Sequence, residues 1–111
     1  MKIETLKDRI ENAKAKIEKK ENTIIKKTAL IAKKEDKIRQ LGFDPSADQR
    51  EVANASKEAF WLMCDIESLE DDISRGNREI KETKASLKKY EQQLAGEIEK
   101  ESILLKDIPE S

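Results

Sequence analysis

Few residues in this chain could carry out chemistry. It has no histidine, and Cys64 is its only cysteine. A histidine base, a histidine-based catalytic triad and a zinc site built from histidine and cysteine are therefore excluded. A single cysteine cannot form an internal disulfide, which indicates a reducing compartment, so we expect a cytoplasmic protein. Cys64 is expected to act as a small apolar side chain rather than as a reactive thiol.

Five carboxylates follow Cys64 in close succession and form the most plausible metal-binding cluster. They are Asp65, Glu67, Glu70, Asp71 and Asp72. On a helix these side chains would point in several directions, and no oxygen-rich calcium loop surrounds them. The sequence also has no phosphate-binding glycine loop and no nucleophile elbow. It therefore predicts a protein that is not an enzyme and that uses no cofactor or metal ion.

Lysines recur in pairs at an interval of seven residues, at positions 19–20, 26–27 and 33–34. Such a stripe could follow a phosphate backbone. However, residues 1–41 carry 13 basic and 7 acidic side chains, whereas residues 42–111 carry 10 basic and 17 acidic ones. Two halves of opposite charge are expected to lie against each other and to neutralise the lysines. Nucleic-acid binding is therefore the least favoured of three functions.

A heptad repeat positions these lysines. Isoleucine occupies every seventh residue in the first part of the chain: Ile3, Ile10, Ile17, Ile24, Ile31 and Ile38. This period is typical of the apolar seam of a coiled coil. We therefore predict a first helix over about residues 2–41, in which Lys20, Lys27 and Lys34 occupy the other seam position.

A turn over residues 42–45 is predicted to end this helix. Gly42 suits the left-handed residue that closes a helix, and Phe43 can cover the last turn. Asp44 followed by Pro45 is typical of the start of a new helix. A connection this short predicts two antiparallel helices.

The second helix is expected over about residues 46–108. Its apolar seam contains Leu62, Ile66, Leu69, Ile73, Ile80 and Leu87. The heptads stay in frame across residues 74–77, which favours a continuous helix that is at most kinked there. A break near Gly76, which would give a three-helix bundle, is the alternative. The predicted fold is thus all-α, a long antiparallel coiled-coil helical hairpin that forms a single domain over residues 1–111.

The short turn also predicts how the helices align, with facing residue numbers that add up to about 93. In this register the lysines face acidic residues: Lys20 faces Asp72, Lys27 faces Asp65 and Lys34 faces Glu58. Ile17 would face Gly76, and the second helix would have no partner beyond Tyr90. Exposed ion pairs contribute about 0–1 kcal/mol each, so they would select the alignment rather than supply the stability.

Apolar residues outside the seam form a second predicted surface. We expect the first helix and the aromatic run to form one patch at the same level of the hairpin, and the unpartnered end of the second helix to add to the contact. These interface residues are Ile25, Ala29, Leu30, Phe60, Trp61, Met63, Cys64, Leu94, Ile98 and Leu105. Patches of this kind are typical of protein–protein contacts. A second copy of the chain is the favoured partner, as a dimer or larger multi-helix oligomer.

The sequence therefore predicts a coiled-coil module for oligomerisation or scaffolding. The alternative is a small adaptor or inhibitor, of the type that phages and mobile elements encode, which binds a different protein through Phe60 and Trp61. No stretch approaches the ~18–20 uncharged residues of a membrane span, and the charged first residues do not resemble a signal peptide. A heptad pattern is shared by many unrelated chains and assigns no family.

Overall fold

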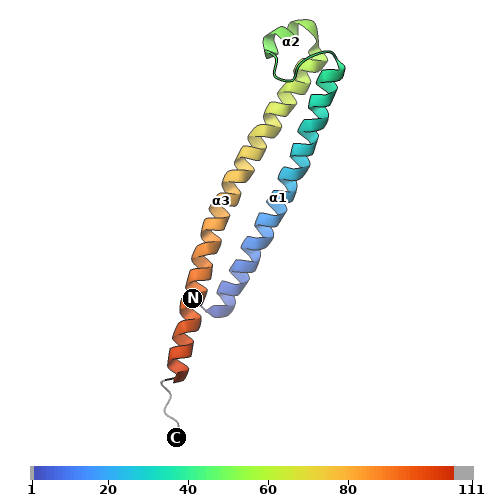
Figure 1. The fold of residues 1–111 in the computed structure, drawn as a ribbon. Coiled ribbons are helices and arrows are strands. Elements are labelled where there is room, and N and C mark those ends of the chain that lie inside the picture. Colours follow the sequence, from blue (N-terminus) through green and yellow to red (C-terminus); the bar gives the residue numbers. More distant parts are fainter. Residues whose placement is uncertain (1, 107–111) are drawn as a thin grey trace. The chain divides into compact units, whose positions relative to one another are not determined.

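A computed structural model describes residues 2–106, with side-chain exposure for residues 2–102. These residues form three helices, α1 (Ile3–Gln40), α2 (Gln49–Ala55) and α3 (Lys57–Lys106) (Figure 1). The predicted all-α helical hairpin is confirmed. The chain divides into two compact units, a terminal unit of residues 1–20 with 79–111 and a hairpin unit of residues 21–78.

In the terminal unit, the first half of α1 packs antiparallel to the second half of α3. Its buried side chains follow the spacing of the heptad seam: Leu6, Ile10, Ala13, Ile17 and Ile80. Lys20 forms an ion pair with Glu79, and the Arg9 guanidinium lies 5.7 Å from the centre of the Tyr90 ring. An apolar stripe of this spacing is what turns a highly charged segment into a stable helix, because packing supplies most helical stability.

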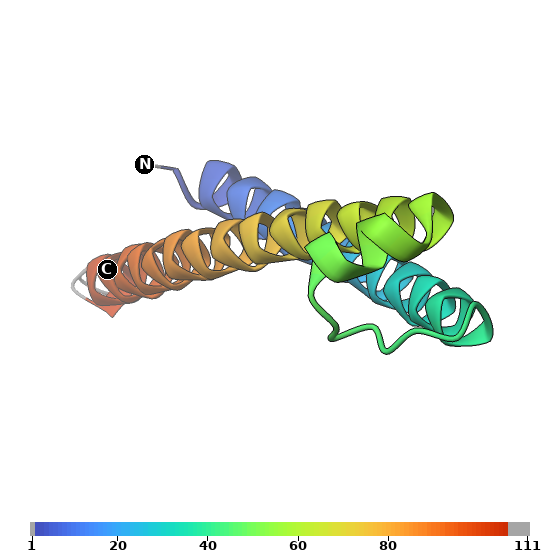
Figure 2. The same ribbon diagram turned by 90° about the horizontal axis from the view of Figure 1, so that it is seen from above.

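In the hairpin unit, the core lies where all three helices meet. Ile38, Val52, Ala59 and Met63 form a buried cluster. The short helix α2 lies against the first turns of α3, and its Val52 is 2% exposed (Figure 2). Full burial of an aliphatic side chain stabilises the folded state by about 1.5–3 kcal/mol.

The end of α1 follows the prediction for Gly42 and Phe43. Gly42 has a φ of 91°, and its N–H donates to the Arg39 carbonyl at 2.9 Å. The Phe43 N–H donates to the Ile38 carbonyl at 3.1 Å, and the Phe43 side chain packs on the core cluster. These two bonds and this apolar contact make up the Schellman motif that closes many helices.

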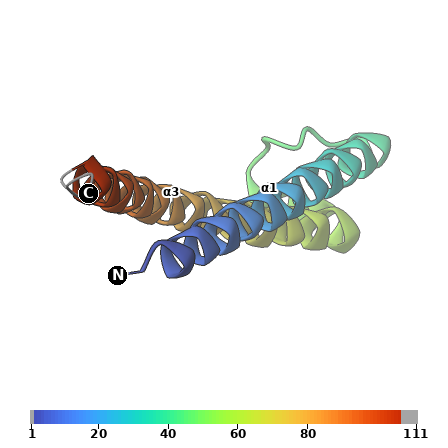
Figure 3. The same cartoon turned by 90° about the horizontal axis from the view of Figure 1, so that it is seen from below.

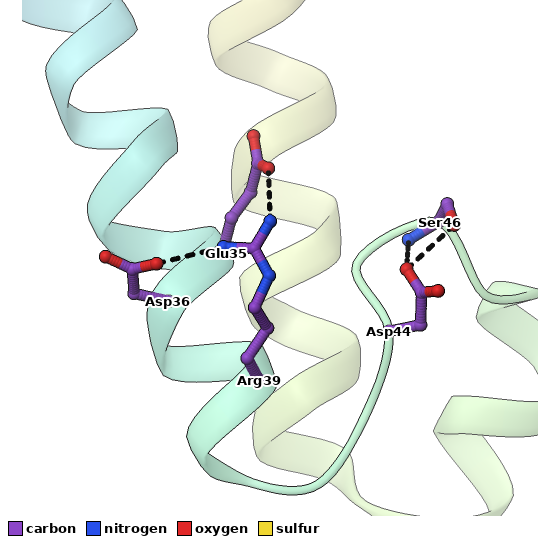
Figure 4. Close-up of polar contacts among 5 residues, drawn as sticks. All are labelled: Glu35, Asp36, Arg39, Asp44 and Ser46. Carbon is purple, nitrogen blue, oxygen red and sulfur yellow. Dashed lines mark hydrogen bonds and ion pairs between the residues drawn. The ribbon is translucent and has the colours of Figure 1, made fainter.

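The prediction that Asp44 and Pro45 start the next helix is wrong. The Asp44 carboxylate instead accepts bonds from the Ser46 N–H at 2.9 Å and from the Ser46 Oγ at 2.8 Å (Figure 4). The backbone bond is the main cause that holds the pKa of Asp44 below its usual value. Because this carboxylate closes a local turn, the cap of α2 falls to Asp48, which accepts a backbone bond at 3.0 Å.

Ser56 separates α2 from α3, so the predicted helix over 46–108 is divided near its start. Ser56 has an extended backbone, with φ −154° and ψ 116°, and its N–H donates to the Val52 carbonyl at 2.7 Å. Its Oγ accepts a bond from the Ala59 N–H at 3.2 Å and thereby caps α3. Residues 41–56, called the connection below, therefore loop out to one side instead of forming a tight turn (Figures 2 and 3).

Helix α3 is continuous through Gly76, as favoured from the sequence. A Cβ atom on Gly76 would lie 3.2 Å from Cδ1 and 3.3 Å from Cγ1 of Ile24. The glycine thus has a packing role, but its predicted partner, Ile17, is wrong by seven residues. The third helix arises at the connection, and the alternative of a break near Gly76 is wrong.

Alanine substitutions at two glycines of α3 test this contact. A Cβ on Gly96 would meet no atom within 4 Å. We expect Gly96→Ala to raise the free energy of unfolding by about 0.5–1 kcal/mol, because alanine favours a helix more than glycine does. Gly76→Ala should gain clearly less, and the gain should recover in an Ile24→Val background that lacks Cδ1. Denaturant unfolding followed by circular dichroism measures these values, and equal gains in the wild-type background would contradict the packing role.

Candidate interaction surface

Three lysines of α1 bond carboxylates of α3. Within the terminal unit Lys20 pairs with Glu79. Within the hairpin unit Lys27 Nζ lies 3.0 Å from an Asp72 oxygen, and Lys34 Nζ lies 3.2 Å from an Asp65 oxygen. Both units thus share one alignment, in which the paired residue numbers add up to 99.

The predicted partners of these lysines are therefore wrong by one heptad. Lys34 pairs with Asp65 rather than with Glu58, and Glu79 takes the place that the prediction gave to Asp72. The cause is the connection, because residues 41–56 separate the long helices where the sequence predicted residues 42–45. Glu79 could have been found in the sequence, since it continues the seven-residue series of Asp65 and Asp72.

These pairs contribute little to the free energy of folding. The paired lysine and aspartate side chains of the hairpin unit are between 28% and 58% exposed. Ion pairs with this exposure are worth about 0–1 kcal/mol each. The hydrogen bond from Lys27 is the main cause that lowers the pKa of Asp72, and Arg75 adds to the shift. The pairs thus favour one alignment and leave most of the stability to the apolar cores.

The lowered pKa of Asp72 gives a prediction for acid. Its folded-state pKa lies below the ordinary value of 3.8, so the Lys27–Asp72 pair stabilises the fold above that pH. The contribution is lost as the pH falls through the folded-state pKa. We therefore expect wild type to exceed Asp72→Asn in thermal midpoint at pH 6, and the two midpoints to converge at the acid end. Asp71→Asn keeps the Lys27–Asp72 pair and serves as the control. A difference in thermal midpoint between wild type and Asp72→Asn that persisted at the acid end would contradict the assignment.

Arg39 near the end of α1 is bound within its own helix. Its guanidinium lies 2.9 Å from Asp36 and 3.5 Å from Glu35 (Figure 4). A cation in the last turn also interacts favourably with the helix dipole. Arg39 therefore interacts with the end of its own helix.

The seam residues of the prediction are buried or half-buried. Buried are Ile10, Ile17, Ile38 and Ile80. Half-buried are Ile3, Ile24, Ile31, Leu62, Ile66, Leu69, Ile73 and Leu87. The seam thus faces inward in each unit.

The residues of the predicted contact surface differ widely in exposure. Ile25 is 66% exposed, Trp61 64% and Leu30 45%. Ala29 is also exposed, while Phe60 and Cys64 are half-buried. Met63 is 4% exposed and belongs to the core, so its assignment to the outer surface is wrong. The reason is α2, which the sequence did not separate from α3 and which covers this side of α3 through Val52.

The observed register also splits the predicted patch in two. Trp61 lies at the level of Ile38 of α1, whereas Ile25 lies about 13 residues, or ~20 Å, further along that helix. Ile25, Ala29 and Ala32 share one face of α1 and are called the α1 stripe below. Phe60, Trp61 and Cys64 form the α3 patch, in which the two aromatic ring centres are 5.6 Å apart. Leu30 follows Ala29 directly and lies on another side of α1.

The far end of α3 is covered further than predicted. Ile3 of α1 and Glu97 of α3 line the same open groove in the terminal unit. Leu94 is half-buried and Ile98 is 48% exposed, so the uncovered part begins about one heptad beyond Tyr90. The side chain of Leu105 lies outside the described residues.

Among the described residues, no three carboxylate or thiol side chains are arranged to hold a metal ion. None of the described helices is long and apolar enough to cross a membrane. Cys64 is a free thiol. What remains as a candidate site is the pair of outward apolar faces in the hairpin unit.

Comparison with family models, with curated proteins and with solved structures finds no significant match for this chain.

Proposed function

We propose that this chain is a non-enzymatic coiled-coil module that associates with copies of itself and so helps to hold a larger assembly together. The observation that carries this proposal is the exposure of Ile25 and Trp61, which are 66% and 64% exposed on helices rich in charge. Ile25 lies in the α1 stripe and Trp61 in the α3 patch, and exposed apolar patches are typical of contact sites. The free thiol of Cys64 fits a reducing compartment such as the cytoplasm.

A second candidate is an adaptor or inhibitor that binds a different protein. The observation that favours it is the contact of Phe60 with Trp61, because tryptophan and neighbouring aromatic residues often supply most of the binding energy of an interface. The two candidates differ in what happens to the purified chain. Self-association raises its molar mass, whereas an adaptor stays a monomer until its partner is added.

Light scattering as a function of concentration separates these candidates. For the proposed module we expect a mass that rises above the 12.7 kDa of one chain. Ala29→Glu, which places a charge in the α1 stripe, should return the mass to that of a monomer. Ala15→Glu is the matched control, because Ala15 is also an exposed alanine of α1 but lies 14 residues away. A wild-type monomer at every concentration would overturn self-association.

A further inference from the structure

The carboxylates of α3 that pair with α1 recur at the interval of the heptad repeat. In the hairpin unit Lys27 pairs with Asp72. Lys34 pairs with Asp65, and Glu58 stands one heptad before Asp65. If α1 and α3 slid by one heptad, or ~10 Å, Lys27 would meet Asp65 and Lys34 would meet Glu58. The seam isoleucines of α1 repeat at the same interval, so neither the charges nor this side of the seam distinguishes the two registers.

The residues of α2 continue the apolar seam of α3. Val52 and Ala55 precede Ala59 and Leu62 by seven residues each. If α2 and α3 formed one helix, these four side chains would therefore lie on the same face. Ser56 is the single residue between the two helices, and its N–H already donates to the Val52 carbonyl at 2.7 Å, the bond that a continuous helix makes. Joining α2 to α3 thus requires a change of backbone conformation centred on Ser56.

The joined helix would preserve most of the apolar core. The core cluster consists of Ile38, Val52, Ala59 and Met63. The first three occupy seam positions of the heptad frame, so they would stay between the helices after the slide. Met63 directly follows the seam residue Leu62 and lies outside that frame. The slide would therefore move Met63, which is 4% exposed in this structure, from the core to the surface.

From these observations we propose that the hairpin unit has two registers and that α2 selects between them. With α2 packed beside α3, Val52 and Met63 complete the core and hold the register of this structure (Figure 2). With α2 joined to α3, the connection shortens, the long helices align one heptad away and Met63 is exposed. This conformational switch needs contacts within one chain only, so it is independent of the self-association proposed above.

Spin labels at exposed residues of the hairpin unit report the register. One pair of labels is placed at Lys37 and Asn77, and the other at Asn22 and Glu67. The slide would separate the first pair by a further ~10 Å along the helix axis and bring the second pair closer by the same amount. The labels are attached to introduced cysteines in a chain in which Cys64→Ser removes the native thiol. Dilution with unlabelled chain confines the measurement, by pulsed electron paramagnetic resonance, to distances within one copy.

Met63→Glu is expected to drive the chain into the second register. A carboxylate is costly where Met63 is buried, whereas the joined helix would leave it in water. The variant should therefore keep its helical circular dichroism, while the labels at Lys37 and Asn77 move apart and those at Asn22 and Glu67 approach each other. Met63→Leu is the matched control, because it keeps an apolar side chain of similar size and should keep the wild-type distances.

Lys57→Pro tests whether the slide depends on joining α2 to α3. Lys57 is the first residue of α3, where proline is well tolerated, and the extended backbone of Ser56 suits the position before it. Proline would nevertheless disrupt a helix that continued from α2. Alone, Lys57→Pro should leave both distances unchanged; combined with Met63→Glu, it should prevent the slide and unfold the chain.

Three results would overturn the proposal. A Met63→Glu chain that unfolds has no second register to occupy, and one that keeps the wild-type distances tolerates the charge in the first. If Met63→Glu still changed both distances in the presence of Lys57→Pro, the slide would not depend on α2.

Discussion

Ile38→Ala is expected to lower the free energy of unfolding by about 2–5 kcal/mol. Ile38 is 0% exposed and lies in the cluster that joins α1, α2 and α3. Removing most of its side chain takes apolar contacts from Val52 and Met63 and leaves a cavity. Denaturant unfolding of the purified variant, followed by circular dichroism, gives the value.

Ile25→Ala is the matched control, with the same substitution on the same helix. Ile25 is 66% exposed, so its loss should change the free energy of unfolding by less than about 0.5 kcal/mol. Both variants should be measured at a concentration at which the chain is a monomer, because Ile25 lies in the α1 stripe. Equal losses at the two positions would contradict the arrangement of the hairpin unit.

Met63→Ala should be the second strongly destabilising substitution, by about 2–5 kcal/mol. Here the sequence and the structure lead to opposite expectations. As part of an outer contact surface, Met63 would contribute little to the stability of the monomer. As a side chain 4% exposed beneath α2, it should contribute as a core residue does.

Trp61→Ala, two residues earlier, provides the comparison for Met63. Trp61 is 64% exposed and packs on Phe60, whose ring centre is 5.6 Å away. An aromatic contact of this type is worth about 0.5–1.5 kcal/mol, so the monomer should lose no more than that. If Trp61→Ala lost more unfolding free energy than Met63→Ala, the core would lie on the Trp61 side of α3, which would contradict the structure.

The sequence predicted the helices and their inward faces well because these depend on local pattern. Isoleucine at every seventh residue defines the seam of α1 whatever lies opposite. Gly42 and Phe43 end the helix through bonds to residues only a few positions away. The continuity of α3 through Gly76 followed from the unbroken frame of the heptads.

The alignment of the helices and the position of α2 could not be predicted in this way. Asp65 and Asp72 stand in a series of acidic residues spaced by seven, so the lysines find carboxylates in either of two registers. The choice depends on the length of the connection, and hence on Asp44, whose turn resembles a helix cap in sequence, and on Ser56, which interrupts the helical pattern. Neither residue is exceptional enough to reveal its role alone.

The sequence identified exposed apolar residues of the candidate interaction surface, but it placed them together in one patch where the structure separates them. Ile25 and Trp61 were identified because apolar side chains outside a heptad seam stand out. Their assembly into one patch depended on the register, and the shift of one heptad left them ~20 Å apart along the hairpin. The assignment of Met63 failed for a related reason, since α2 covers a side of α3 that a two-helix hairpin leaves open.

The connection has a consequence for how the fold could vary. Charges that recur every seven residues tolerate slippage, because a slide by one repeat leaves most lysines opposite a carboxylate. The irregular segment that carries Val52 does not repeat, and it therefore helps to distinguish one sliding position from the next. If a short reverse turn replaced this segment, α1 and α3 could align one heptad away. Glu58 would then pair with a lysine of α1, and Glu79 would no longer do so.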